Sequence, residues 1–515
     1  MIREKTKKLV EDACKKVFKD RKSIVSIEKP PREKFGDYTA KVYFLSLKKR
    51  YSSSMSEMMV LPSLKECIRL IEEIKRSPIF SEFFSDVEFQ EPFFINFFAS
   101  KEYLQKQVKD ILKKKDKFGN LKIGKNQKVN VEFISANPTG PLTLGNARGG
   151  FGGDVLSNVL EKAGYNVTRE FYINDRGKQI ENLKRGLYKG ETRTASQIQK
   201  ENQKTIIKNM KIKFDIWFSE RNLYKNKEID KVLALLKRKK LTYEKEGALW
   251  FKSTEFGDDK DRVLIRENGK TTYFASEIAY LKNKFNRGFK KLIIFLGADH
   301  YGYVKRMKAA VIALGYEKNQ LDFVIFQLVA IMWTGGTGEK ELIKMSKREG
   351  IYRSIDELVD EKEGIGLDVS RFFFLQRGTN SHLTFDLDLA KEKSSKNPVY
   401  YVQYAYARIS SILRKAKTKP SKDLKLLEED SELDLIKQLI RFEEILEDTA
   451  KDYQIQRIPQ YALELAESFH HFYQCCQVIS EDKKLSSSRL ALVLATQIVL
   501  KNTLDLMGIS APEKM

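Results

Sequence analysis

A strand, a glycine-rich loop and a helix follow one another between residues 129 and 163, and this unit most restricts how the chain can fold. VNVEFIS (Val129–Ser135) alternates apolar and polar residues with the period of a strand. The loop contains NPTGP and then PLTLGNARGG (Pro141–Gly150), after which apolar residues recur at helical spacing up to Ala163. A strand that feeds a helix through a tight loop is the repeating unit of parallel α/β sheets.

Further strand patterns at residues 167–173, 291–297 and 323–329 each neighbour a helical pattern. They predict an α/β fold with a Rossmann-like, doubly wound parallel sheet. Residues from about 185 to 260 interrupt the alternation and indicate an insertion. From about residue 390 strand signals end and long helical patterns follow, which predicts an all-α helical bundle at the C-terminus.

The first 115 residues predict a separate α/β unit. Helical spacing occurs at 2–18 and 64–76, and we interpret YTAKVYFLSLKKR (Tyr38–Arg50) as a further helix. The lysine-rich stretch Lys113–Lys128 is typical of a linker. We therefore expect three domains: an N-terminal α/β domain (1–115), the doubly wound domain (116–390, with the insertion) and the all-α domain (391–515).

Composition indicates a polyanionic partner or a well-solvated lysine-rich surface, and does not separate the two. Lys and Arg number 94 against 70 Asp and Glu, a net charge of +24 over 515 residues. The cysteines are Cys14, Cys67, Cys475 and Cys476, with no CxxC pair, so we expect neither bound zinc nor disulfides, as in a reducing cytoplasm. The apolar runs 323–333 and 491–500 are shorter than a membrane span, so we expect no membrane association.

Two segments predict a phosphate site. The loop up to Gly153 would present backbone N–H groups at a helix N-terminus, where anions bind. It matches neither a Walker A loop nor GxGxxG. The second segment is KMSKR (Lys344–Arg348), whose lysines could neutralise a leaving pyrophosphate. Alternatively, the glycines at 149, 150, 152 and 153 serve close packing, and KMSKR is a solvated charge run.

In combination these blocks resemble the class I aminoacyl-tRNA synthetases, and in detail the arginyl-tRNA synthetases. The loop corresponds to the family's HxGH-type motif and KMSKR to its KMSKS-type motif. Other similar blocks follow in family order: PPREKFGDYTA, FYINDRGKQI, FDIWFSE, GALWFKSTEFGDDKDRVLI, TTYFASEIAYLKNKFNRGF, GADHYGYVKR, RFFFLQRGTNSHLTFDLDLA, YYVQYAYARI and the ending GISAPEKM. The resemblance therefore covers nearly the whole chain.

The resemblance implies an arginine–tRNA ligase acting on L-arginine, ATP and tRNA-Arg. The N-terminal domain would touch the outer corner of the tRNA, the Rossmann-like domain would be catalytic, and the helical domain would read the anticodon. Family members usually need bound tRNA even to activate arginine. The resemblance also implies Mg²⁺ carried by ATP, held mainly by phosphates and water, and a monomer.

The resemblance further implies roles for individual residues. The catalytic set would be Thr143, Gly145, Asn146, Lys344, Ser346 and Lys347. ATP would contact Pro141, Leu142, Thr143, Gly145, Asn146, Met345 and Lys347. Arginine would contact Glu132, Ser135, Ala136, Asn137, Tyr273, Glu277 and His300. The tRNA anticodon would lie near Tyr401, Gln403, Tyr404, Tyr406, Ala407 and Arg408. Carboxylates suit a guanidinium, and aromatic residues suit unpaired bases.

Three positions depart from the family pattern. Thr143 and Asn146 stand where the family has histidines; a hydroxyl and an amide can still donate hydrogen bonds, so we interpret TLGN as a working variant. Glu277 stands where the family usually has Asp, which extends the carboxylate by about 1.5 Å. Two alternatives stay open: a catalytically impaired tRNA-binding paralogue, and a related synthetase for another amino acid.

Overall fold

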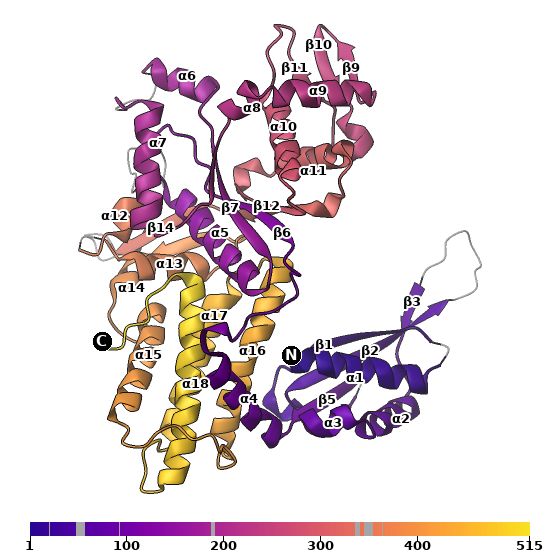
Figure 1. The fold of residues 1–515 in the computed structure, drawn as a ribbon, viewed down its shortest axis with the longest axis vertical. Helices are drawn as coiled ribbons and strands as arrows, with labels where there is room; N and C mark the ends of the chain where they lie inside the picture. Colours follow the sequence, from indigo (N-terminus) through magenta and orange to yellow (C-terminus); the bar gives the residue numbers. More distant parts are fainter. Residues whose placement is uncertain are drawn as a thin grey trace.

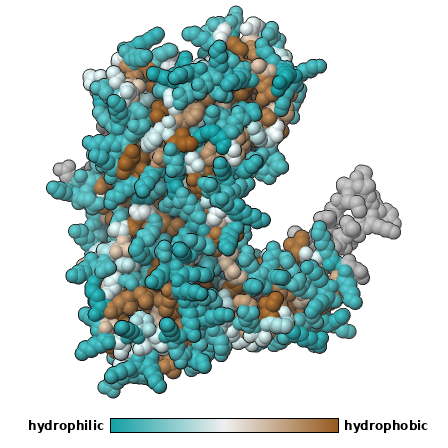
Figure 2. All heavy atoms as spheres, viewed as in Figure 1, coloured by the Kyte–Doolittle hydropathy of each residue, from teal (hydrophilic) through white to brown (hydrophobic). Residues whose placement is uncertain are grey.

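Figure 1 shows three parts: a small N-terminal unit, a sheet-containing central part and a bundle of long helices beneath it. The computed structural model describes residues 1–515 apart from residues 20, 48–56, 92, 187–190, 335–339, 344–353 and 363. Hydrophilic side chains cover most of the face drawn in Figure 2, as the high content of charged residues requires.

The N-terminal unit is an antiparallel sheet covered by helices. The sheet has the order β1-β2-β5-β4, with β3 also paired to β2. Its elements are α1 (Ile2–Val17), β1 (Ser23–Glu28), β2 (Tyr38–Leu47), β3 (Glu57–Val60), α2 (Leu64–Lys75), α3 (Pro78–Phe83), β4 (Phe84–Gln90) and β5 (Phe94–Ala99). Helix α4 (Lys101–Lys114) then leads towards the central part.

Strand β2 corrects the interpretation of this segment as a helix, which is wrong. The strand pairs antiparallel with both β1 and β5. Every second residue is buried in the core with the period of a strand: Tyr38, Ala40, Val42 and Phe44. Tyr, Thr, Val and Phe all favour strands, so local preference and partner strands act together here.

Five parallel strands form the central sheet, in the order β13-β12-β6-β7-β8. They are β6 (Lys128–Glu132), β7 (Asn166–Ile173), β8 (Ile216–Ser219), β12 (Lys291–Gly297) and β13 (Leu321–Phe326). Ile293 and Phe295 belong to the same apolar core as α5 (Leu144–Lys162), whereas Leu292 and Ile294 belong to the core built with α10 (Tyr273–Asn286) and α11 (Tyr303–Leu314). Helices therefore cover both faces, which confirms the predicted doubly wound sheet.

The interval from 185 to 260 contributes to two sheets. Its strand β8 pairs with β7 at the edge of the central sheet. The remainder builds most of a small antiparallel sheet of order β11-β10-β9 with nearby helices. The elements beside and within this interval are α6 (Lys178–Lys184), α7 (Ala195–Lys204), α8 (Arg221–Lys225), α9 (Glu228–Arg238), β9 (Thr242–Lys245), β10 (Ala248–Phe251) and β11 (Arg262–Ile265).

A second, three-stranded sheet follows the central one, in the order β15-β14-β16. Strand β14 pairs parallel with β16 and antiparallel with β15. Its elements and the adjoining helices are β14 (Val329–Thr334), β15 (Lys340–Ile343), α12 (Ile355–Val359), α13 (Leu367–Leu375), β16 (Leu383–Asp386) and α14 (Leu387–Lys391).

The C-terminal part is the predicted helical bundle. It consists of α15 (Pro398–Lys415), α16 (Asp430–Asp452), α17 (Arg457–Cys475) and α18 (Lys483–Met507). Helix α18 is long and apolar enough to cross a membrane by length and composition, but 72% of its apolar window is buried inside the protein. It packs against α15, α17 and the central helix α5, so it is the core helix of the bundle.

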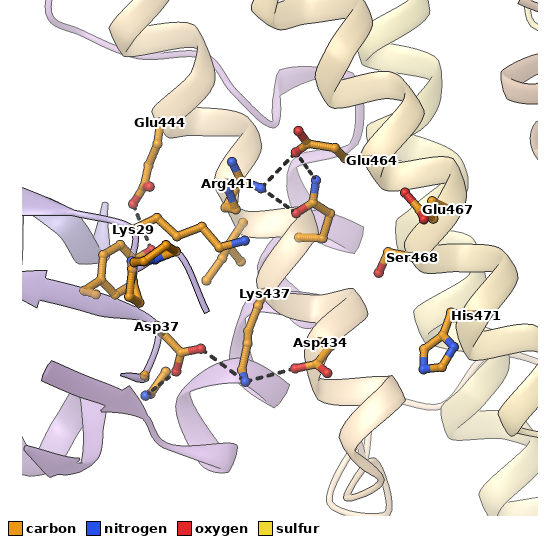
Figure 3. A pocket seen from close by; sticks show the side chains of 17 residues that line it. Lys29, Asp37, Asp434, Lys437, Arg441, Glu444, Glu464, Glu467, Ser468 and His471 are labelled. Carbon is orange, nitrogen blue, oxygen red and sulfur yellow. Dashed lines mark hydrogen bonds and ion pairs between the residues drawn. The ribbon is translucent and has the colours of Figure 1, made fainter. Parts of the chain in front are cut away.

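A polar cleft of about 460 Å³ separates the N-terminal unit from α16 and α17 (Figure 3). Lys437 on α16 reaches across it to Asp37 at 3.1 Å, and the Tyr38 hydroxyl donates to Glu444 at 2.9 Å. Beside the cleft, Arg3 forms an ion pair with Asp448 at 2.7 Å. Charged and hydroxyl groups thus join the two ends of the chain at this junction.

Candidate active site

A cavity of about 1120 Å³ opens at the carboxyl ends of the central strands. Ligands of doubly wound sheets bind at this edge. The predicted site residues that line it are Glu132, Ser135, Ala136, Asn137, Pro141, Thr143, Gly145, Asn146, Tyr273, Glu277 and His300. Leu142 does not line it, because its side chain is buried in the core. Lys344, Met345, Ser346 and Lys347 lie outside the described residues.

The N-terminus of α5 forms one end of this cavity, and a capping box between Thr143 and Asn146 ends the helix there. The Thr143 hydroxyl accepts the Asn146 N–H at 3.2 Å and donates to Asn146 Oδ1 at 3.0 Å. The Thr143 N–H also donates to Asn146 Oδ1, at 2.9 Å. The cap therefore uses the Thr143 proton and the Asn146 oxygen. The sequence predicts two side-chain donors here, the Thr143 hydroxyl and the Asn146 amide. The cap uses the hydroxyl proton and leaves the Asn146 N–H₂ group without a bond in the cap.

The glycines of this segment have two different functions. A Cβ on Gly145 would meet only the Thr143 hydroxyl oxygen, at 3.5 Å, so the space beside it is open cavity. A Cβ on Gly153 would lie 2.2 Å from the Phe133 ring, and one on Gly149 would lie 2.8 Å from Phe326. The later glycines therefore permit close packing of α5 on the sheet, as the alternative interpretation proposed for them.

A strained turn follows β6 and directs side chains into the cavity. Ile134 and Ser135 have φ of +65° and +40°, which is unusual for residues with a side chain and most unusual for a β-branched one. The Ser135 hydroxyl accepts the Tyr172 N–H at 3.1 Å and donates to Glu132 at 3.1 Å. Such strain persists where surrounding contacts impose it, and it often marks binding sites.

Glu132 has a partner that the sequence did not reveal. Its Oε2 accepts a hydrogen bond from Lys284 Nζ at 2.5 Å, and the Lys284 side chain is fully buried. Lys284 lies on α10, three helical turns from its N-terminus. Glu132 therefore faces the cavity as part of an ion pair, with one oxygen bound to Lys284 and the other to Ser135.

Two further carboxyl groups are incompletely paired: Glu277, which lines the cavity, and Glu220, which does not line it but whose charge acts on Glu277. The Oε2 atoms of Glu277 and Glu220 are both buried, and no described residue gives either one a hydrogen bond. Burial raises the pKa of Glu277 to about 8; Arg306 opposes the shift, and Glu132 and Glu220 add to it. Burial and the neighbouring Asp175 raise the pKa of Glu220 to about 7, against Arg176. Unpaired buried carboxyls of this kind are suited to receive a cationic ligand.

Glu220 was missed in the sequence, although a signal for it exists. It is the first residue after β8, at the carboxyl end of a central strand, where ligand groups concentrate. The segment FDIWFSE that contains it was identified without a role for its glutamate. The interval was interpreted as an insertion, and its strand was not predicted.

The remaining predicted arginine-site residues lie around the same space. Asn137 Oδ1 accepts a hydrogen bond from Asn174 at 2.7 Å, which fixes its amide. A Cβ on Gly177 would lie 2.1 Å from the Tyr273 hydroxyl oxygen, so only glycine fits at position 177. The His300 ring lies edge-on to Tyr303, 5.4 Å between centroids.

The residues predicted to contact the anticodon divide into exposed and buried groups. Tyr404 is 38% exposed, and Arg408 donates to its hydroxyl at 2.6 Å and lies over its ring. His470 and Tyr473 of α17 join this surface: His470 lies 5.1 Å from Tyr401, and Arg408 lies 5.3 Å from Tyr473. The sequence did not predict these two α17 residues.

The other three residues predicted to contact the anticodon are less exposed: two are buried and Gln403 is half-buried. Tyr406 and Ala407 are buried in the bundle. Gln403 donates to Asp368 at 2.9 Å and to the Ser510 carbonyl at 3.0 Å, so it joins α15 to the C-terminal segment. Their positions follow from the helical period, which turns these side chains away from the exposed face.

Three family models match consecutive parts of the chain. The arginyl-tRNA synthetase N-terminal domain matches residues 4–99. The class I (R) tRNA synthetase catalytic domain matches 107–215 and 189–369. The DALR anticodon-binding domain matches 402–515.

Whole-chain comparisons agree with these matches. An arginine–tRNA ligase of Carboxydothermus hydrogenoformans is 40% identical over 95% of this chain and 94% of its own. Another, of Halalkalibacterium halodurans, is 43% identical over 83% of this chain and 85% of its own. The structure of Thermus thermophilus arginyl-tRNA synthetase shares the fold, with a TM-score of 0.76 and 20% identity over all of both chains. This protein therefore belongs to the class I arginyl-tRNA synthetases, the family of arginine–tRNA ligases.

Proposed function

We propose that TLGN and Glu277 are working variants and that this ligase activates L-arginine with ATP to arginyl-adenylate and diphosphate. It then transfers the arginine to the 3′ end of tRNA-Arg. One observation carries the proposal: a single cavity has a cation-binding and an anion-binding end. Glu277 supplies an unpaired carboxyl oxygen on the cavity wall, and the charge of Glu220 acts on Glu277 from nearby. The N-terminus of α5 supplies N–H groups and a helix dipole.

The guanidinium of arginine binds at the carboxylate end. Glu277 and the Tyr273 hydroxyl are its direct partners, and Glu220 adds negative potential behind them. Glu132 is already bound to Lys284, so it does not offer arginine an unpaired charge. It forms part of the pocket wall and orients the Ser135 hydroxyl. Ala136, Asn137 and His300 complete the pocket around the reacting carboxylate of arginine.

The nucleotide binds at the α5 end, between Pro141 and Asn146. The Asn146 amide donates to a phosphate oxygen, Thr143 holds that amide in place, and Gly145 leaves room for the nucleotide. Lys344, Met345, Ser346 and Lys347 act on the leaving diphosphate by correspondence of sequence. Mg²⁺ arrives with ATP; the described residues beside the α5 N-terminus are mostly amides and hydroxyls, which suits an ion held by phosphates and water.

The positive net charge of +24 attracts the tRNA, and the anticodon meets the exposed face of α15 and α17. Tyr401, Tyr404 and Arg408 stack on unpaired bases, together with His470 and Tyr473. We further propose a cytoplasmic monomer, a location that suits the four free thiols.

The test is charging of tRNA-Arg by the purified protein with ATP, Mg²⁺ and labelled arginine, with other amino acids in parallel. Glu277→Gln is the matched control, because it keeps the size of the side chain and removes its charge. Arginine charging that this variant reduces supports the proposal. Intact tRNA binding without charging supports the impaired paralogue, and charging with another amino acid overturns the arginine specificity.

A further inference from the structure

Arg148 is a buried cation on α5, one turn from the phosphate end of the cavity. Only 3% of it is exposed. Its guanidinium donates to four backbone carbonyls: Gln327 at 2.8 Å, Leu328 at 3.5 Å, Gly378 at 2.9 Å and Ser381 at 2.7 Å. The described residues give it no ion pair, and burial lowers its pKa to about 10. A buried charge held by carbonyls alone is costly, so its retention needs an explanation.

The carbonyls belong to two loops that meet beside the cavity. Gln327 and Leu328 form the turn between β13 and β14, where the chain passes from the central sheet to the three-stranded sheet. Gly378 and Ser381 precede β16, the parallel neighbour of β14. The Gln327 N–H also donates to the Thr379 carbonyl at 2.9 Å. Arg148 therefore fastens α5, the turn and the second loop together.

The fastened turn is part of the cavity wall. Phe326, Gln327, Leu328 and Val329 all line the cavity. Phe326 also packs against Gly149 of α5, so the turn borders the α5 end rather than the carboxylate end. Leu328 is 71% exposed, an unusual state for a large apolar side chain that faces a cavity. An apolar surface at this place suits the base or sugar of a nucleotide.

We infer that Arg148 is a positioning residue for ATP, which holds the Gln327–Leu328 turn against α5 so that Leu328 contacts the bound nucleotide. The inference rests on the proposed function and adds a residue to it. A planar guanidinium can serve four carbonyls at once, and a lysine ammonium with three donors cannot reproduce that geometry. Loss of the fastening therefore displaces Leu328 and leaves the distant arginine end unchanged.

The experiment measures ATP–pyrophosphate exchange, with tRNA-Arg present, for the wild type, Arg148→Lys and Leu328→Ala. We expect both variants to raise KM for ATP about tenfold and to change KM for arginine less than about twofold. Because both act through one turn, the double variant should raise KM for ATP by less than the product of the single effects. Leu328→Ala alters an exposed side chain, so it tests the inference even where Arg148→Lys does not fold.

Arg371→Lys is the matched control. Arg371 is also buried and donates to backbone carbonyls, but it joins α5 to the ends of other helices through Asp154 at 2.8 Å and the Met507 carbonyl at 2.9 Å. It should lower the melting temperature without raising KM for ATP. An unchanged KM for ATP in Leu328→Ala, or an equal rise in Arg371→Lys, overturns the inference. An inactive wild type would instead refute the proposed function.

Discussion

Arginine binding should become tighter as the pH rises through 8, because the proposed guanidinium partner must lose a proton first. Burial raises the pKa of Glu277 to about 8 in the free protein. At pH 7 about one molecule in eleven then holds the ionised carboxylate, at pH 8 about half, and at pH 9 about ten in eleven. Since apparent affinity scales with the competent fraction, the dissociation constant for arginine should fall about fivefold from pH 7 to pH 8 and about tenfold by pH 9.

The folding stability of the free protein should fall as the pH rises, whereas arginine binding becomes tighter. An acid whose folded-state pKa lies above its ordinary value of 4.5 binds its proton more tightly in the folded protein. Glu277 therefore contributes its full share to folding stability below about pH 4.5, and this share is lost as the pH rises through about 8. Bound arginine should compensate, so the rise in melting temperature that saturating arginine produces should grow over the same range.

Calorimetry in buffers of different ionisation enthalpy provides the assay, because it counts protons released on binding. We expect about 0.9 proton per arginine at pH 7 from Glu277 alone, and more if Glu220 also ionises. Glu277→Gln should abolish the pH dependence and weaken binding at every pH. Glu277→Asp should change KM for arginine more than kcat. No proton release by the wild type between pH 6.5 and 8.5 would refute the reasoning.

Three further predictions follow from single contacts. Lys284→Met should cost about 3–5 kcal/mol in chemical unfolding because it leaves Glu132 buried without its cation, and adding Glu132→Gln should recover most of that loss. Asn146→Ala should slow activation about a hundredfold or more in pyrophosphate exchange if its amide is the phosphate donor; a change within threefold would exclude it. Tyr404→Leu should weaken tRNA-Arg binding by about 1–3 kcal/mol in a filter-binding titration, and charging at saturating tRNA should stay near the wild-type rate.

The sequence predicted the parts of the fold that local patterns determine. In the strand–loop–helix unit at 129–163, the apolar residues follow strand and then helix spacing and a glycine-rich loop separates the two. The structure has β6 and α5 there. The segment at Tyr38–Leu47 was interpreted wrongly, because its apolar residues fit a helix and a strand over a short window. Pairing with β1 and β5, which come from elsewhere in the chain, decides the outcome.

The same distinction applies to the cavity. The resemblance predicted residues such as Thr143 and Glu277 because they lie in recognisable blocks, and the structure places both on the cavity wall. It did not predict what those residues contact. Lys284 is 152 positions from Glu132, and Glu220 follows a short strand of ambiguous pattern. Ion pairs between such distant positions depend on the packed fold, which no local pattern specifies.

Two of the three departures from the family pattern, Thr143 and Asn146, make the pH dependence of this enzyme simpler to interpret. Histidines in the motif would add titrating groups at the phosphate end, whereas Thr143 and Asn146 are neutral at every pH. The acids with raised pKa that titrate in this range are then Glu277, which lines the cavity at the opposite end, and Glu220, whose charge acts on Glu277. Tyr172 and Tyr303 also line the cavity, but their pKa values are raised further above the ordinary value of 10. His300 also lines the cavity, so His300→Asn separates its effect from theirs. If activation in that variant still rises from pH 6.5 to 8.5 and KM for arginine falls in parallel, the rise originates at the carboxylates. A rise with constant KM for arginine would instead assign it to the chemical step at the phosphate end.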